Sequence, residues 1–135
     1  MNKAKREIDF LVIGSGIAGI SYALKVAAIG KVLMLTKSDE DESNTKYAQG
    51  GIAAVMYEPD SYNKHIDDTL ICGDGVCDER IVKLVIEEST QRIDELIKWG
   101  TQFDKTAARN YDLAKEGRHS EKRMLHHKEN PRLDR

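Results

Sequence analysis

The fold of this chain is decided by residues 8–19, which read IDFLVIGSGIAG. Residues 8–13 form a near-continuous apolar run, which is typical of a parallel strand buried on both faces. Residues 14–19 match the pattern G-x-G-x-x-G. Apolar residues at helical spacing follow over residues 17–28, and a second apolar run occupies residues 31–35. We therefore predict a β-α-β unit over the first 35 residues.

The glycines of residues 14–19 have separate physical roles. Gly14 permits a sharp turn, Gly16 lets a pyrophosphate approach the backbone, and Gly19 lets the helix pack closely on the strand. The amino end of the following helix presents N–H groups and a positive dipole end to phosphates. A glycine-rich turn without a ligand is the alternative, which the flanking strand and helix disfavour. We predict dinucleotide binding by Gly14, Ser15, Gly16, Ile17, Ala18 and Gly19.

The end of the second apolar run departs from the pattern of NAD-dependent dehydrogenases. Those enzymes usually carry Asp or Glu about twenty residues after the glycines, where it binds the ribose. Here the run ends at Thr36 and Lys37. A plain NAD-binding dehydrogenase is therefore disfavoured, and a different nucleotide arrangement is favoured.

The middle of the chain predicts one further strand and two helices. A tight turn over residues 48–51 precedes a predicted buried strand over residues 52–56. Ser61 and Asp78 are suitable N-caps for helices to about residue 72 and over residues 79–99. The second of these helices carries one apolar stripe, as a helix packed on a core does.

Composition narrows the function classes. The chain is 40% hydrophobic and 33% charged with a net charge of −2, which gives no electrostatic footprint for nucleic acid or an anionic membrane. The apolar run near the start is too short for a bilayer span or a secretory signal, so we predict a cytoplasmic protein without a transmembrane segment. Cys72 and Cys77 lack a second Cys or His pair at zinc spacing, and no metal site is predicted. His126 and His127 are interpreted as part of a solvated basic end.

A second motif resembles a known family. Residues 44–54 read NTKYAQGGIAA, which is similar to the A-Q-G-G-I signature of the succinate dehydrogenase, fumarate reductase and L-aspartate oxidase flavoproteins. In that superfamily the segment wraps the flavin, and Thr36-Lys37 also matches the family. The resemblance therefore implies FAD as cofactor. It adds these cofactor-binding residues: Lys37, Asn44, Thr45, Lys46, Tyr47, Ala48, Gln49, Gly50 and Gly51.

Within this superfamily the chain most resembles the L-aspartate oxidases. The resemblance is carried by Tyr47 before A-Q-G-G, by residues 67–78 and by EGRHS at residues 116–120, although Arg118 replaces a family glycine. The dehydrogenase and reductase subunits generally attach FAD covalently through a histidine five residues before the glutamine of A-Q-G-G. That position is Asn44 here, and an amide cannot act as the nucleophile. The resemblance thus implies non-covalent FAD.

The family reaction oxidises L-aspartate to iminoaspartate in NAD (quinolinate) biosynthesis, with oxygen or fumarate as the electron acceptor. Glu116 matches the family glutamate that interacts with the substrate's amino group, so the resemblance implies a catalytic role. A solvated loop carboxylate is the alternative for this residue. Quinolinate synthase is a candidate partner.

The expected fold is α/β: a Rossmann-like FAD-binding β-α-β unit with additional helices, forming an incomplete FAD-binding domain. Residues 1–127 are predicted to be the amino-terminal part of that domain, and residues 128–135 an atypical or truncated tail. Because family members are several times longer, the fragment alone is expected to be inactive. Two alternatives are a fragment of a fumarate reductase or succinate dehydrogenase flavoprotein subunit, and a non-catalytic nucleotide-binding module.

Overall fold

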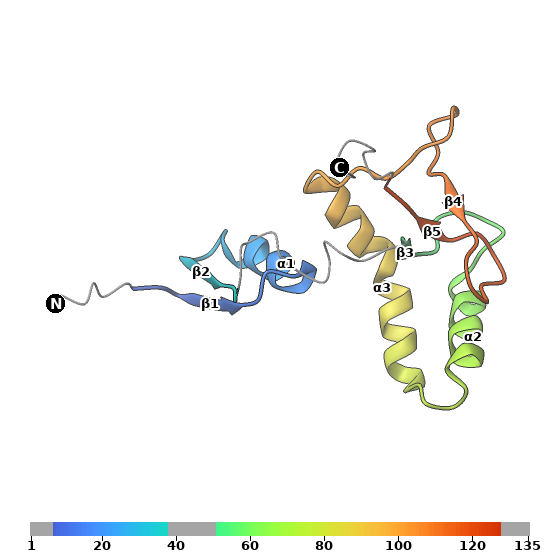
Figure 1. The fold of residues 1–135 in the computed structure, drawn as a ribbon, viewed down its shortest axis with the longest axis horizontal. Coiled ribbons are helices and arrows are strands. Elements are labelled where there is room, and N and C mark those ends of the chain that lie inside the picture. Colours follow the sequence, from blue (N-terminus) through green and yellow to red (C-terminus); the bar gives the residue numbers. More distant parts are fainter. Residues whose placement is uncertain (1–6, 38–50, 128–135) are drawn as a thin grey trace. The chain divides into compact units, whose positions relative to one another are not determined.

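The computed structural model describes residues 7–37 and 51–127 and divides the chain into two units, Met1–Gln49 and Gly50–Arg135. The first unit contains strand β1 (Phe10–Ile13), helix α1 (Ile17–Val26) and strand β2 (Val32–Leu35) (Figure 1). The two strands are parallel, with register from Phe10↔Val32 to Ile13↔Leu35. The predicted β-α-β unit is therefore confirmed, and its α/β character agrees with the expected fold class.

The prediction that the first strand is buried on both faces is wrong for the described residues. Val12 is 6% exposed and lies against α1 at Gly19, whereas Leu11 and Ile13 on the other face are 51% and 80% exposed. Successive side chains of a strand point to opposite faces. Of the described elements in this unit, only α1 packs on the sheet, and it covers one face.

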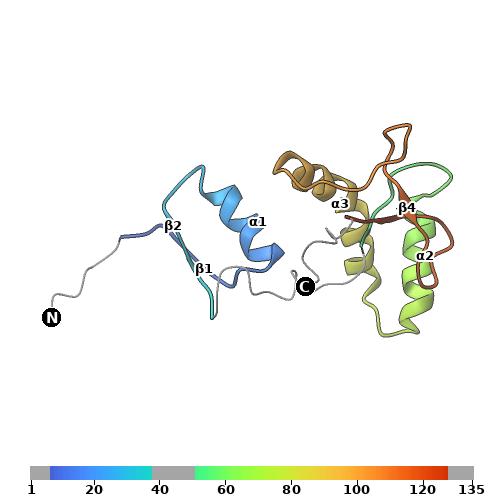
Figure 2. The same ribbon diagram turned by 45° about the horizontal axis from the view of Figure 1, so that its top comes forward.

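The second unit combines two helices with a small antiparallel sheet. Helices α2 (Tyr62–Gly73) and α3 (Glu79–Lys98) pack side by side (Figures 1 and 2). The strands are short: β3 (Ile52–Ala53), β4 (Leu113–Ala114) and β5 (Met124–Leu125). Their order is β3-β5-β4, and both pairings are antiparallel. Strand β5 is thus the central strand of this sheet.

Both predicted helix starts are confirmed by their caps. The Ser61 hydroxyl accepts a hydrogen bond from the Lys64 N–H at 3.3 Å. The Asp78 carboxylate accepts from the N–H of Arg80 at 2.9 Å and of Ile81 at 3.4 Å. These side chains satisfy backbone donors that a helix start otherwise leaves without partners.

The strand predicted over residues 52–56 is shorter than expected. It covers Ile52–Ala53, and Ala54 adds one hydrogen bond from its N–H to the Arg123 carbonyl. The next carbonyl, that of Val55, accepts instead from the Thr90 hydroxyl of α3 at 2.8 Å. A helix side chain thus takes the place of a strand partner, and the ladder ends.

The core of the second unit lies between its sheet and α3. Three fully buried residues form its centre, namely Ala54, Ile93 and Leu125. Partly buried side chains surround them, namely Met56, Leu96, Ile97, Phe103, Tyr111 and Leu113. In the ranges 7–37 and 51–127, no helix is both long and apolar enough to cross a membrane.

Candidate functional site

The glycine loop, residues 14–19, has the backbone geometry that dinucleotide binding requires. Gly14 adopts φ +110°, a conformation that side chains rarely allow, and its N–H donates to the Leu35 carbonyl at 2.8 Å. A Cβ on Gly19 would collide with the Gly14 carbonyl oxygen. The loop can therefore bring β1 and α1 together only because both positions are glycine.

The start of α1 suits a phosphate group. Gly16 is the N-cap, and no side chain of the described residues caps this helix by a hydrogen bond. A helix start without a side-chain cap presents its N–H groups and dipole to an anion. The glycine loop thus fits the pyrophosphate of a dinucleotide such as FAD.

The other predicted residues of the first unit lie on the adjacent strand end. Ser15 is buried, and its hydroxyl donates to the Thr36 hydroxyl at 3.2 Å, which ties the loop to the end of β2. Lys37 follows directly and is exposed. The structure therefore places the glycine loop and Thr36-Lys37 at one edge of the β1-β2 sheet, as parallel strands require.

The flavin segment, residues 44–51, lies mostly outside the described residues. Asn44, Thr45, Lys46, Tyr47, Ala48, Gln49 and Gly50 fall there, and their predicted roles stay predictions. Gly51 is described and directly precedes β3. A Cβ on Gly51 would collide with the Leu125 carbonyl oxygen, so glycine permits the close approach of β5.

Glu116 lies in the Glu116 loop, residues 115–121, which connects β4 to β5. Its side chain is 47% exposed, and its Oε1 lies 3.4 Å from His126 Nε2. Gly117 adopts φ +56°, whereas Arg118 does not have a positive φ. The glycine that this turn needs is therefore present at residue 117, and Arg118 does not break it.

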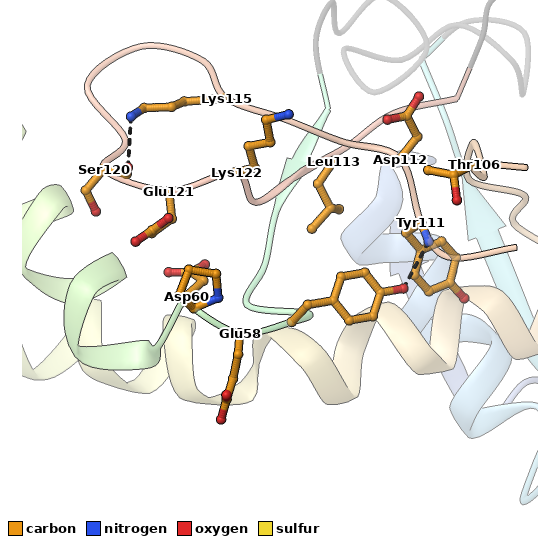
Figure 3. Close-up of a pocket in the computed structure, with 12 residues that line it drawn as sticks. Glu58, Asp60, Thr106, Tyr111, Asp112, Leu113, Lys115, Ser120, Glu121 and Lys122 are labelled. Carbon is orange, nitrogen blue, oxygen red and sulfur yellow. Dashed lines mark hydrogen bonds between the residues drawn. The ribbon is translucent and has the colours of Figure 1, made fainter. Parts of the chain in front are cut away.

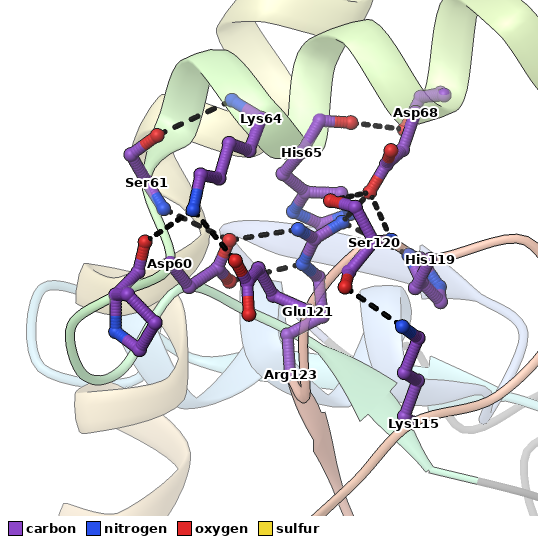
Figure 4. Close-up of polar contacts among 12 residues, drawn as sticks. Asp60, Ser61, Lys64, His65, Asp68, Lys115, His119, Ser120, Glu121 and Arg123 are labelled. Carbon is purple, nitrogen blue, oxygen red and sulfur yellow. Dashed lines mark hydrogen bonds and ion pairs between the residues drawn. The ribbon is translucent and has the colours of Figure 1, made fainter.

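A buried guanidinium group holds the base of the Glu116 loop (Figure 4). Arg123 is 0% exposed and binds both oxygens of Asp60, at 2.9 Å from Nε and 2.7 Å from Nη2. Its Nη1 donates to Asp68 at 2.6 Å and lies 3.0 Å from His119 Nδ1. The same Asp68 oxygen accepts from the N–H and hydroxyl of Ser120, at 2.7 and 2.8 Å. We call these five residues the Arg123 network.

The network fixes the charge of its members. Burial alone would raise the pKa of Asp68, but hydrogen bonds from Ser120 and Arg123 outweigh burial and lower the pKa to about 2. Burial alone would lower the pKa of Arg123, but hydrogen bonds to Asp60 and Asp68 raise it. A cation therefore lies buried between carboxylates, an arrangement that is destabilised strongly when one partner is removed.

His65 lies against this network from α2. It is 6% exposed, and its ring faces the His119 ring with 5.5 Å between centroids. Burial, together with the charge of Arg123 and the nearby His119, lowers the pKa of His65 to about 4. His65 is therefore neutral at neutral pH, which suits a structural residue.

A pocket of about 550 Å³ lies beside the Glu116 loop (Figure 3). Its lining comes from residues 57–60, from residues 106, 111–113 and 115, and from residues 120–122. Acidic and basic side chains both line it, among them Asp112 and Lys122. None of the predicted site residues that the structure describes lines this pocket, so it is separate from the predicted site.

Sequence reasoning missed the Arg123 network and the half-buried position of His126. The interpretation of His126 as part of a solvated basic end is wrong, because its Nε2 is buried and lies 3.4 Å from Glu116 Oε1. Arg123 directly precedes β5 and lies two residues before Leu125, and both are buried, as alternate residues of an extended backbone that share one face can be. That alternation was the available signal, although a charged residue rarely occupies such a position.

Comparison with known proteins places this geometry in a family. A family model described as an FAD binding domain matches residues 9–135. The tobacco protein "L-aspartate oxidase 2-a, chloroplastic" is 50% identical over 121 residues, covering 90% of this chain and 19% of the relative. The L-aspartate oxidase of Vibrio cholerae is 47% identical over 127 residues, covering 90% and 24%. The chain thus spans about a fifth to a quarter of the length of these relatives.

Solved flavoprotein structures share the fold. The Mycobacterium smegmatis Sdh1 structure in complex with UQ1 superposes with a TM-score of 0.82 at 31% identity, covering 88% of this chain and 20% of that one. The FrdA chain of Escherichia coli quinol fumarate reductase gives 0.81 at 25% identity, covering 87% and 21%. The expected fold, the FAD-binding region of such a flavoprotein, is confirmed as a partial domain.

Proposed function

The chain belongs to the FAD-binding domain family, and on that premise we propose that it is the dinucleotide-binding part of an L-aspartate oxidase. The observation that carries FAD binding is the glycine loop, in which Gly14 has a positive φ and Gly19 touches the Gly14 carbonyl. The choice of L-aspartate as substrate is supported by the identity to L-aspartate oxidases across nine-tenths of the chain.

The residues of this chain hold the cofactor without a covalent bond. The glycine loop binds the pyrophosphate at the start of α1, and Lys37 and the flavin segment complete the contacts. Asn44 stands where a covalent flavoprotein of this superfamily has histidine, so no imidazole is available for attachment. Bound FAD supplies the acceptor for a hydride from the substrate carbon.

Glu116 binds the amino group of L-aspartate in this proposal. A half-exposed carboxylate can pair with an ammonium group or take a proton from it before the carbon is oxidised. The product is iminoaspartate, the electron acceptor is oxygen or fumarate, and the reaction serves NAD biosynthesis through quinolinate. Quinolinate synthase is the proposed partner. We propose a cytoplasmic location, although the tobacco relative is named chloroplastic.

The first experiment is a titration of the 135-residue chain with FAD, followed by acid precipitation. Saturable binding with all colour in the supernatant is expected. Gly14→Ala should weaken binding at least about tenfold, because alanine disfavours φ +110° where the pyrophosphate passes. The matched control is Gly75→Ala, which also changes a glycine of positive φ with no atoms near its Cβ. Equal affinities of the two variants would contradict the proposed site.

Colour that stays in the acid pellet would favour the second candidate, a succinate dehydrogenase or fumarate reductase flavoprotein subunit. The fold shared with the Mycobacterium smegmatis and Escherichia coli structures supports that candidate. The activity itself is tested in a chimera, in which residues 1–127 replace the matching segment of the Vibrio cholerae relative. L-Aspartate should bleach its flavin absorbance anaerobically. A chimera that binds FAD but is not bleached would contradict the substrate assignment.

A further inference from the structure

We propose that His126 is the positioning residue for Glu116: its imidazole lies between Gly51 and the predicted catalytic carboxylate, and it holds the carboxylate at a fixed place relative to Gly51. This proposal rests on the proposed function, because it concerns the same site. Three features of the described residues carry it: the rigid backbone of His126, the contact of Nε2 and the contact of Nδ1.

The backbone of His126 is held on both sides. It directly follows Leu125, which is 1% exposed and ends the central strand β5. The His126 carbonyl accepts a hydrogen bond from the Asp104 N–H at 2.8 Å. The imidazole is therefore carried by the residue that directly follows the central strand, whereas Glu116 is carried by a loop.

Nε2 of His126 faces Glu116. It lies 3.4 Å from Glu116 Oε1, is buried, and makes no hydrogen bond of good geometry to any described residue. Buried polar atoms are normally hydrogen-bonded, and when Nε2 carries the ring proton, the Glu116 carboxylate beside it is a suitable acceptor. The carboxylate is half-exposed and needs only a small movement to accept it. Hydrogen bonds of catalytic groups are often long without substrate and shorten when it binds.

Nδ1 of His126 faces the other way, toward Gly51. A Cβ added to Gly51 would lie 3.1 Å from this nitrogen, so the ring occupies the space beside Gly51 that a side chain would need. Gly51 is the last residue of the flavin segment. One ring thus has one nitrogen beside Gly51 and the other beside Glu116.

The Arg123 network does not perform this task. It binds Ser120 and His119 and thereby fixes the base of the Glu116 loop, and Lys115 adds a bond to the Ser120 carbonyl at 2.8 Å. The contact that orients the Glu116 carboxylate itself comes from His126. When Nε2–H donates to one carboxylate oxygen, the remaining lone pairs stay available for a substrate ammonium group.

The contact is tested without substrate by NMR of the histidine ring nitrogens in the 135-residue chain. At a fixed neutral pH, Glu116→Gln should shift the Nε2 resonance of His126, because the charged acceptor is lost. The matched control is Glu121→Gln, which removes a carboxylate of the same loop that pairs with Lys64 at 2.6 Å. A His126 resonance that responds equally to both variants, or to neither, would overturn the contact.

The positioning role is tested in the chimera by anaerobic flavin reduction with L-aspartate. His126→Phe keeps a ring but removes the donor, and should lower the limiting rate about tenfold with little change in the aspartate dissociation constant, as misplacement of a reacting group does. His126→Gln restores a donor and should recover most of the rate. His127→Phe, at the exposed neighbouring position, is the control and should react like the wild type.

A double variant separates positioning from general stability. If His126 acts through Glu116, the combination of His126→Phe with Glu116→Gln should be no slower than Glu116→Gln alone. Effects that multiply would overturn the proposal. A wild-type chimera that binds FAD but is not reduced would refute the proposed function while the NMR contact stands. A chimera that reacts normally with His126→Phe would refute this inference alone.

Discussion

The pH dependence of stability should be dominated between pH 6.5 and pH 4 by one residue, His65. Its pKa falls from 6.5 to about 4 on folding, first because of burial and then because of Arg123 and His119. Over this range His65 is protonated in the unfolded chain but not in the folded chain, so the free energy of unfolding decreases as the pH falls. At about 1.4 kcal/mol per pH unit, the loss amounts to about 3 kcal/mol.

The assay compares urea unfolding of the wild type with that of His65→Phe, followed by Trp99 fluorescence because Trp99 lies in the same unit. Phenylalanine retains the ring contact with His119 and does not titrate. On acidification from pH 6.5 to pH 4, the urea midpoint of the wild type should fall by about 2 M more than that of the variant. This value follows from a free energy of unfolding that decreases by about 1.5 kcal/mol per M of urea. His127→Phe, at an exposed position, should behave as the wild type. If the unfolding free energies of the wild type and His65→Phe changed in parallel with pH, His65 would not be the group responsible.

Three further outcomes follow from the same contacts. Arg123→Met should lower the free energy of unfolding in urea by about 3–5 kcal/mol, because it leaves the buried carboxylates of Asp60 and Asp68 without their cation. Arg92→Met, on the exposed face of α3, should leave the urea midpoint nearly unchanged. Gly19→Ala should destabilise the first unit by about 1–3 kcal/mol, because the added Cβ clashes with the Gly14 carbonyl, and hydrogen exchange of the β1 amides measures this loss. Replacing glycine by alanine usually stabilises a helix, so a stabilised unit would contradict the clash. The pKa of Asp68 is lowered to about 2 in the folded state, so the stabilisation it gives is lost as the pH falls from 4 to 2. In Asp68→Asn the free energy of unfolding should therefore fall by about 2 kcal/mol less than in the wild type over this range. An unchanged acid transition would contradict this expectation.

The sequence predicted the helix starts and the glycine loop well because these features are local. Ser61 and Asp78 cap helices through backbone groups two or three residues away. The glycine pattern also acts within six residues, where the geometry of turn and helix leaves few alternatives. The sequence could not show that the described residues cover only one face of β1, because that depends on which elements pack on the sheet.

Local sequence was enough for the β-α-β unit, the two helices and the likeness to FAD-binding flavoproteins, since spacing and residue type along a short stretch specify each of them. The folded chain was needed to show that Arg123 is buried with Asp60 and Asp68, which lie 63 and 55 residues away in the chain. It alone brought His126 between Gly51 and Glu116. In a chain that is one-third charged, an arginine or histidine near the end has the pattern of a solvated residue. Arg123 and His126 flank β5, and the packing of β5 between β3 and β4 brings them against segments distant in the sequence, which bury Arg123 fully and His126 in part.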